Sequence, residues 1–269
     1  MSDCNYTVAD LRYLMQRLRD PQTGCPWDIK QNFKTIAPHT VEEVYEVIDA
    51  IERGDLQHLR EELGDLLFQI IFYSQLGAEQ GLFDWDMIVS GITDKLISRH
   101  PHVFPDGTLQ SVRSADAIFD TKKINNTWEL IKQRERAEKG ETGILADIPI
   151  SLPALSHACK LQKRAASVGF DWADPQDVLA KIKEEIAELE IEIAKGDKVA
   201  MEDEMGDLLF SCVNLARHLS LDPERATRLS SSKFKRRFQA MELLAAGKNF
   251  TNMTSAELEL LWAQVKTQE

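Results

Sequence analysis

The sequence predicts an all-α protein made of two tandem helical-bundle modules joined by a charged helical linker. Apolar residues recur mostly at intervals of three and four residues, which is the period of an α-helix. Alternating stretches flanked by hairpin-turn residues, which would indicate β-strands, are scarce. A long acidic motif occurs twice with the same internal spacing, as expected for a duplicated structural unit.

The helical period runs through nine segments and a short tenth that starts at Ser255. The nine are Val8 to Arg19, Val41 to Arg53, Leu56 to Gln80, Trp85 to Arg99, Ala115 to Lys139, Leu155 to Ser167, Pro175 to Lys195, Lys198 to Leu219 and Pro223 to Ala246. Between His100 and Gly143 the pattern is broken by prolines and glycines around a highly charged helix. We therefore expect an N-terminal module, a linker and a C-terminal module over residues 1–105, 106–145 and 146–269.

Composition excludes several classes of partner. The formal net charge of -12 argues against nucleic acid and anionic membrane surfaces, which require clustered positive charge. The most apolar stretch, Leu66 to Leu76, is interrupted by polar residues, and no secretory leader is expected. The four cysteines lack a paired spacing, so neither a zinc cage nor a disulfide framework is predicted. We expect a soluble protein of the reducing cytoplasm.

The repeated motif is EExxE followed 16 residues later by ExxD. An offset of 142 residues superimposes the two copies without a gap. Glu42, Glu43 and Glu46 align with Glu184, Glu185 and Glu188; Gly54-Asp55 with Gly196-Asp197; and Glu62 and Gly64 to Phe68 with Glu204 and Gly206 to Phe210. Each copy therefore reads as two helices joined by a Gly-Asp turn.

The spacing places the acidic side chains along one edge of each helical pair. Glu185 and Glu188 border the apolar stripe of their helix, and Glu204 and Asp207 border that of the next. The first stripe comprises Ile182, Ile186, Leu189 and Ile193. If the helices pack antiparallel, four carboxylates converge. Crowded carboxylates repel one another, whereas Mg²⁺ prefers oxygen ligands and bridges to phosphates, so the motif predicts a magnesium site.

Structural explanations of the motif compete with this one. Glutamates at such spacing are common on solvated helix faces, and a duplicated hairpin could keep its charges by descent alone. Thr40 with Glu43 also fits a capping box, which would make Glu43 a helix-start residue. In the second copy, however, Asp174-Pro175 looks like the helix start and Glu185 lies about three turns inside. Capping therefore cannot explain both copies.

Seven segments spread over nearly the whole chain resemble one known family. They are GCPWD (Gly24 to Asp28), TIAPHTVEEVYEVIDAI (Thr35 to Ile51), ELGDLLFQ (Glu62 to Gln69), RHPHVF (Arg99 to Phe104), SLPAL (Ser151 to Leu155), VGFDW (Val168 to Trp172) and EMGDLLF (Glu204 to Phe210). In these segments the chain resembles the MazG family of nucleoside triphosphate pyrophosphohydrolases, which belongs to the superfamily that includes dimeric dUTPases. The resemblance implies two four-helix-type modules, commonly assembled as homodimers, and hydrolysis of a nucleoside triphosphate to its monophosphate and pyrophosphate.

The resemblance also implies roles for individual residues. One or two Mg²⁺ ions would be held in the C-terminal copy by Glu185, Glu188, Glu204 and Asp207, and a second candidate site would be Glu43, Glu46, Glu62 and Asp65. Phosphate contacts would come from Lys181 and from Lys233, Lys235, Arg236 and Arg237, with Trp262 near the nucleotide. Ala200 and Met201 stand where relatives can carry more polar residues, which weakens the carry-over there.

The chemistry of the proposed reaction adds a catalytic candidate. A triphosphate hydrolase must neutralise the phosphates and activate a water, and Glu184 is our candidate general base, beside Glu185 and Glu188. The basic run from Lys233 to Arg237 can instead be a solvated helix face without a binding role, and Trp262 can instead be a packing residue. An aromatic face that stacks on any base would suit broad base specificity. His100 and His102 lack metal-ligating partners in the sequence and are left out of the site.

The resemblance implies a nucleotide-hydrolysing enzyme with a role in nucleotide-pool sanitation or stress-related control. The C-terminal copy is expected to be the principal active site because it is followed by the richer basic cluster; the N-terminal copy can be active, weaker or structural. The competing hypothesis is a non-enzymatic helical protein whose acidic faces bind partners. A ferritin-like di-iron bundle would need Glu-x-x-His pairs, which both motif copies lack.

Overall fold

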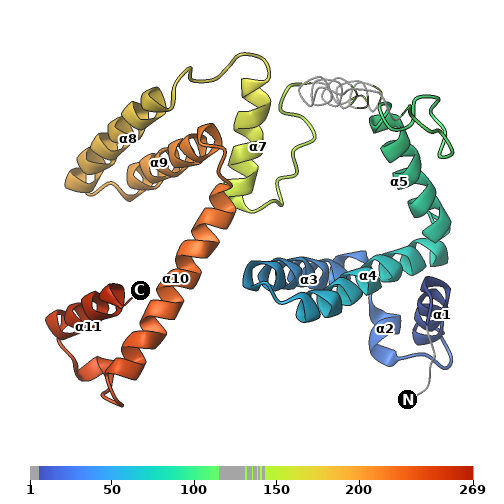
Figure 1. Ribbon diagram of the computed structural model, residues 1–269, viewed down its shortest axis with the longest axis horizontal. Coiled ribbons are helices and arrows are strands. Elements are labelled where there is room, and N and C mark those ends of the chain that lie inside the picture. Colours follow the sequence, from blue (N-terminus) through green and yellow to red (C-terminus); the bar gives the residue numbers. More distant parts are fainter. Residues whose placement is uncertain are drawn as a thin grey trace. The chain divides into compact units, whose positions relative to one another are not determined.

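Figure 1 shows the computed structural model, which describes residues 6–114, 131, 135, 138, 140 and 143–268. Throughout these residues the regular structure is helical, so the all-α prediction is confirmed. The helices form two units, Met1–Ile131 and Lys132–Glu269, each treated separately below. The module boundaries 1–105 and 146–269 stay a prediction, and the linker helix from Ala115 to Lys139 falls largely outside the described residues.

Among the described residues, no helix is both long and apolar enough to span a membrane.

The first unit is built on an antiparallel helical hairpin. Its helices are α1 (Val8–Leu18), α2 (Pro26–Lys30), α3 (Phe33–Arg53), α4 (Leu56–Glu79) and α5 (Trp85–Arg99). Figure 1 shows α3 and α4 side by side, and α1 and α5 pack against α4. The prediction missed α2, because a helix of five residues is too short to display a period.

The start of α3 corrects the sequence prediction. The helix begins at Phe33 rather than Val41, with Asn32 as its cap and Thr35 completing a capping box. Pro38 lies inside this helix although it lacks the N–H that would bond four residues back. The helix continues through it because this segment buries Ile36, which is 1% exposed. Thr40 therefore lies inside the helix, and the capping explanation of Glu43 is wrong.

The core of the first unit is completed by a buried arginine. Met15, Ile36, Ile71, Phe72 and Leu76 form the buried cluster. Beside it, Arg19 donates from Nε to Glu79 Oε1 at 2.8 Å and from Nη2 to Glu79 Oε2 at 2.6 Å. Its Nη1 donates to the backbone carbonyls of Asp28 and Gln31, and its guanidinium lies 5.3 Å from the ring centroid of Phe72. This bidentate pair ties α1 to α4.

Replacing Arg19 by methionine is expected to destabilise the first unit by about 1–3 kcal/mol, because two backbone carbonyls and Glu79, whose 35% exposed side chain is partly screened by solvent, lose their donor. The hydrogen bonds from Arg19 lower the pKa of Glu79. This stabilisation is therefore present above the unfolded-state pKa of about 4.3 and is lost as the pH falls through the lower folded-state pKa. Urea unfolding at neutral pH and in acid measures both effects. A difference between wild type and Arg19→Met that persists unchanged in acid would contradict the ion-pair explanation.

The second unit repeats the hairpin with different flanking helices. Its elements are α7 (Ala154–Ala166), α8 (Pro175–Lys195), α9 (Lys198–His218), α10 (Pro223–Leu244), the 3-10 helix η1 (Phe250–Asn252) and α11 (Ser255–Thr267). Figure 1 shows α8 beside α9, and α7 and α10 also contact α9. The predicted bounds of α7 to α10 and the predicted start of α11 agree with the observed ones within two residues, whereas the three-residue η1 was not predicted.

The two hairpins are closed by the same local signals. Gly54 and Gly196 end α3 and α8 in the left-handed region, with φ of 70° and 74°. An L side chain rarely adopts this conformation, so glycine suits both positions. The following aspartates, Asp55 and Asp197, cap α4 and α9 by accepting backbone N–H hydrogen bonds. The Gly-Asp turn predicted for each copy is therefore present in both.

Candidate active site

The C-terminal hairpin brings three of its predicted acidic residues together. Carboxylate oxygens of Glu185 and Glu188 on α8 and Glu204 on α9 lie within 4.8 Å of one another. Glu185 is only 3% exposed, so it lies within the buried face of α8, not at its border as predicted. Ile186 and Ile193, expected to be buried with the apolar stripe, are 42% and 58% exposed. Glu185 therefore shares the buried face of α8 with Val178 and Leu189.

The electrostatics of this cluster favour a bound cation. Burial raises the pKa of Glu204, and the nearby carboxylates of Glu188, Glu185 and Asp207 raise it further. Lys181 compensates part of this charge, with its Nζ 2.8 Å from Glu184 Oε1 and 2.9 Å from Glu185 Oε1. Hydrogen bonds to both carboxylates raise the pKa of Lys181. An oxygen-rich cluster that still favours protonation suits a hard divalent cation.

A cleft of about 640 Å³ opens beside these carboxylates. Asp207, the fourth predicted ligand, lines it together with Glu185 and Lys181. The remaining wall is aromatic, apolar and polar: Leu145, Leu161, Gln162, Ala165, Gly169, Phe170, Asp171, Trp172, Phe210, Ser211, Asn214 and Arg217. A mostly apolar cavity of this size with a charged end is typical of a small-molecule site. The cleft is large enough for a molecule the size of a nucleoside, and Lys181, Glu185 and Asp207 supply its charged lining.

The N-terminal hairpin repeats the carboxylate cluster. Oxygens of Glu43, Glu46 and Glu62 lie within 4.8 Å of one another. Burial raises the pKa of Glu43, and the charges of Asp65 and Glu46 add to that effect. Burial also raises the pKa of Glu62, against which the nearby His58 acts. Both clusters thus have the same chemistry, and in each the aspartate of the motif contributes to the electrostatics from outside the closest group of three.

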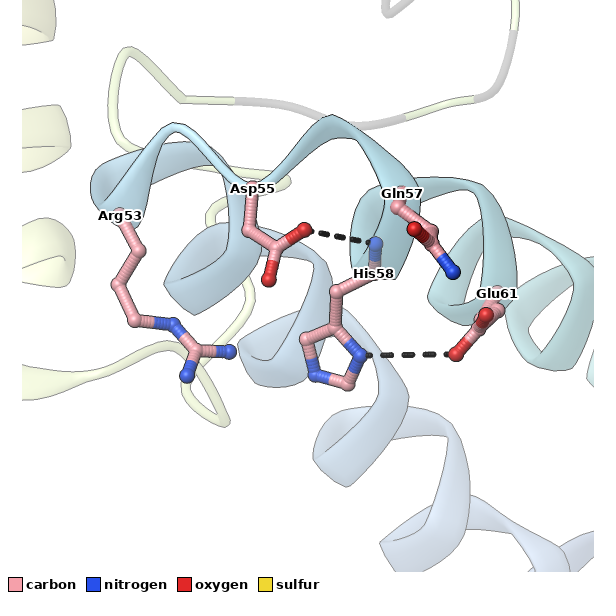
Figure 2. Close-up of a pocket in the computed structure, with 5 residues that line it drawn as sticks. All are labelled: Arg53, Asp55, Gln57, His58 and Glu61. Atoms are coloured by element: carbon pink, nitrogen blue, oxygen red, sulfur yellow. Dashed lines mark hydrogen bonds and ion pairs between the residues drawn. The ribbon is translucent and has the colours of Figure 1, made fainter.

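A histidine distinguishes the N-terminal cluster. His58 Nε2 lies 3.0 Å from Glu62 Oε1, whereas the aligned position in the second copy is Ala200. His58 also lines a pocket of about 300 Å³ at the α3–α4 turn with Arg53, Asp55, Gln57 and Glu61. Figure 2 shows its ring pointing towards Glu61 while its backbone N–H donates to Asp55. This small polar pocket has no aromatic wall and differs in character from the C-terminal cleft.

In the N-terminal module, larger side chains stand at the positions that align with cleft-lining residues of the C-terminal module. At the offset of 142, Ser211 and Asn214 correspond to Gln69 and Phe72. Phe72 is fully buried in the core, and Gln69 is 7% exposed with its Nε2 3.4 Å from Glu43 Oε1. Larger side chains thus occupy the place where α9 contributes small and polar ones. The two copies share the acidic motif but differ in the space beside it.

The predicted basic and aromatic residues gather elsewhere in the second unit. Arg237 on α10 lies with its guanidinium 5.6 Å from the ring centroid of Trp262 on α11, and Phe234 packs 5.5 Å from the same ring. None of Lys233, Lys235, Arg236, Arg237 and Trp262 lines the cleft. The structure therefore brings Arg237 and Trp262 together but does not bring this group to the carboxylates of the same chain.

Sequence reasoning missed most residues of the cleft wall. Asp207, Phe210, Ser211 and Asn214 are spaced at i, i+3, i+4 and i+7, so they share one face of α9. Continuing the helical spacing beyond the acidic motif would have pointed to Asn214. Gln162 comes from α7, far away in the sequence, and donates from Nε2 to the Phe210 carbonyl at 2.8 Å. Such a contact has no local signal.

Comparisons with known proteins agree with this architecture. Residues 31–104 and 173–241 each match the family described as the MazG nucleotide pyrophosphohydrolase domain. The chain is 49% identical over 267 residues to the nucleoside triphosphate pyrophosphohydrolase of Escherichia coli (strain K12), covering 97% of this chain and 98% of that protein. It is 38% identical to "Nucleoside triphosphate pyrophosphohydrolase/pyrophosphatase MazG" of Thermotoga maritima, over 99% of this chain and 98% of that protein. The matched regions contain both helical hairpins with their carboxylate clusters, and the chain belongs to the MazG nucleotide pyrophosphohydrolase family.

Proposed function

We propose that this protein hydrolyses nucleoside triphosphates to nucleoside monophosphates and pyrophosphate, in a Mg²⁺-dependent reaction in its C-terminal module. The observation that carries the proposal is the junction of a carboxylate cluster with a nucleoside-sized cleft, because Glu185 belongs to both. Water adds to phosphorus as the bond between the α- and β-phosphates breaks. Two relatives that match nearly the whole chain are named for this activity.

The positions of the carboxylates suggest two roles, metal binding and activation of water. Glu185, Glu188 and Glu204 would hold one or two Mg²⁺ ions, and Asp207, at the cleft, would complete the ligands. When bound, Mg²⁺ neutralises phosphate charge and lowers the pKa of a coordinated water. Glu184 lies outside the closest group of three and keeps its carboxylate at the surface, so it stays our candidate for the base that removes a proton from water.

Lys181 is placed to serve both the carboxylates and the substrate. Its side chain is 32% exposed and lines the cleft, so one ammonium donor can turn towards an incoming phosphate. Before substrate binds, its contacts with Glu184 and Glu185 hold the ammonium group in place. We therefore assign Lys181 to phosphate binding, with the aromatic side chain of Trp172 offering a stacking surface that tolerates every base. This arrangement favours broad base specificity, with both ribo- and deoxynucleotides accepted as substrates.

A homodimer would bring together the carboxylate cluster and the basic residues of α10, which lie apart within one chain. Ile186 and Ile193 on α8, and Met205 and Leu209 on α9, form exposed apolar positions beside the carboxylate cluster. A second copy covering them would remove apolar surface from water. It could also supply the α10 cluster, Lys233, Lys235, Arg236 and Arg237, together with Trp262, to the phosphates. A cytoplasmic role in nucleotide-pool sanitation or stress-related control would follow from such an activity.

The C-terminal module is assigned as the principal site because of its cleft, not because of the basic run after it. The N-terminal cluster, Glu43, Glu46, Glu62 and Asp65, would hold a cation but lacks an equivalent space for a nucleoside among the described residues. The alternative, a non-enzymatic acidic interaction protein, predicts no nucleotide chemistry at all.

Release of pyrophosphate from a mixture of ribo- and deoxynucleoside triphosphates, with and without Mg²⁺, tests the proposal. We expect turnover with Mg²⁺, loss of turnover on chelation and recovery on adding Mg²⁺ back. Monophosphate and pyrophosphate should appear in equal amounts. Release of single phosphates, or turnover that survives complete chelation, would overturn the assignment; absence of any nucleotide hydrolysis would favour the interaction protein.

A further inference from the structure

One face of α9 continues from the carboxylate end of the cleft to its far end. Asp207, Phe210, Ser211 and Asn214 all line the cleft, and Arg217 follows them one turn later. Asn214 follows Asp207 by seven positions, which is about 10.5 Å along a helix. If phosphates bind at the carboxylates, as the proposed function requires, the ribose occupies this interval and the base reaches Asn214.

The orientation of the Asn214 amide is fixed by its neighbour. Arg217 Nη2 donates to Asn214 Oδ1 at 2.7 Å. Because a guanidinium only donates, the amide oxygen must face Arg217 and the NH₂ group must face away from it. No described residue accepts a hydrogen bond from Asn214 Nδ2, and the residue is partly exposed in the cleft wall. Asn214 therefore presents an unused donor to whatever fills the cleft.

A charged anchor holds Arg217 in turn. Arg217 Nη2 also donates to Asp171 Oδ1, and His218 Nε2 lies 3.1 Å from the same oxygen. Burial alone would raise the pKa of Asp171, but the hydrogen bonds from Arg217 and His218 outweigh it and hold that pKa below its ordinary value. Asp171 is thus ionised at neutral pH. The chain from Asp171 through Arg217 to Asn214 leaves the amide little freedom to flip.

The aligned positions of the N-terminal module do not form a corresponding Asn–Arg pair. Phe72 and Gln75 stand at the positions of Asn214 and Arg217, and Phe72 is buried in the core. Gln75 instead donates to Glu79 on its own helix. The amide donor is therefore present in the C-terminal module, which has the cleft. It is absent from the aligned position of the N-terminal module, where the buried Phe72 occupies the corresponding space. Because both modules form the hairpin but the donor occurs with the cleft, we connect Asn214 with binding of the base and not with stability of the hairpin.

The four common bases share one hydrogen-bond acceptor. On the edge that faces the minor groove in a duplex, purines present N3 and pyrimidines present O2, so this pattern does not distinguish them. We propose that Asn214 Nδ2 donates to this shared acceptor, and that Arg217 and Asp171 are positioning residues that keep the amide turned towards it. A single donor then orients every base without selecting among them. The inference rests on the proposed function and deepens it.

The test compares ATP with 3-deaza-ATP, in which a C–H replaces the N3 acceptor. In the wild-type protein, kcat/KM for 3-deaza-ATP should fall by roughly tenfold relative to ATP, because the donor loses its acceptor. In Asn214→Asp, which keeps the acceptor for Arg217 but removes the N–H donor, the ratio of the two kcat/KM values should approach one. Repulsion between the added charge and the triphosphate is the same for both nucleotides and cancels in the ratio, whereas the carboxylate oxygen facing N3 further disfavours ATP, so the preference for ATP should disappear or reverse.

Two further variants separate positioning from folding. Arg217→Leu frees the amide, so it should bring the ratio towards one while the protein remains folded by circular dichroism. Asn252→Asp, the same change at an exposed position on η1, should keep the wild-type ratio. A wild-type ratio near one, or a tenfold ratio that persists in Asn214→Asp, overturns the inference. If the wild type hydrolyses neither nucleotide, the proposed function itself fails.

Discussion

Replacing Glu185 and Glu188 by glutamine is expected to lower pyrophosphate release from nucleoside triphosphates by at least about 10³-fold at saturating Mg²⁺. Both side chains contribute oxygens to the cluster within 4.8 Å, and Glu185 is almost completely buried. Glutamine keeps the shape and removes the charge that holds the cation. The glutamines relieve repulsion at Glu204 but also remove the ion pair between Lys181 and Glu185, so the variant should differ little in stability from wild type when Mg²⁺ is absent.

The matched control removes two carboxylates from the same two helices outside the cluster. Glu190 on α8 and Glu202 on α9 are exposed and belong to neither the cluster nor the cleft wall. Glu190→Gln with Glu202→Gln should therefore keep turnover within about twofold, since surface substitutions away from a site have small effects. Unchanged turnover in the Glu185, Glu188 double variant would refute the C-terminal assignment.

Giving the C-terminal cleft the side chains of the N-terminal module is expected to raise KM for nucleotides by about 100-fold or more, because the base loses its space. The change is Ser211→Gln with Asn214→Phe, which reproduces Gln69 and Phe72. Both positions are partly exposed, so the larger groups can occupy the cleft without forcing the helices apart. Steady-state kinetics measures the effect.

The same variant distinguishes loss of substrate space from loss of metal. Its affinity for Mg²⁺ in the absence of nucleotide, measured by calorimetry, should stay within a few-fold of the wild-type value, since neither residue carries a carboxylate of the cluster. A variant that retains the wild-type KM would show that the nucleoside binds outside the cleft. Thermal unfolding checks that the second unit remains folded.

The fold was largely predictable because the signals for the hairpins are local. Asp174-Pro175 marks the start of α8, and the Gly-Asp turns end one helix and cap the next. Where burial extends a helix beyond the expected segment, prediction from sequence fails: the expected start was Val41, but α3 begins at Phe33 and buries Ile36. The helix α2 was missed because it is shorter than two turns.

The candidate site was only half predictable. The acidic motif gave the carboxylate cluster, since helical spacing and a Gly-Asp turn determine which side chains meet. Spacing did not show that Glu185 would be buried while Ile186 and Ile193 stay exposed, because burial depends on how α7 and α9 pack. The cleft likewise depends on α7 meeting α9 and on the small side chains of Ser211 and Asn214 at that contact.

The central claim is that the C-terminal cluster and cleft form the nucleotide site of each chain. Calorimetric titration of the full-length protein with an α,β-methylene nucleoside triphosphate, in which the bond to be cleaved is replaced, measures this most directly. The account predicts one nucleotide bound per chain with Mg²⁺, none without it, and none in the Glu185→Gln, Glu188→Gln variant. Two nucleotides per chain, or one that remains bound in that variant, would contradict the account.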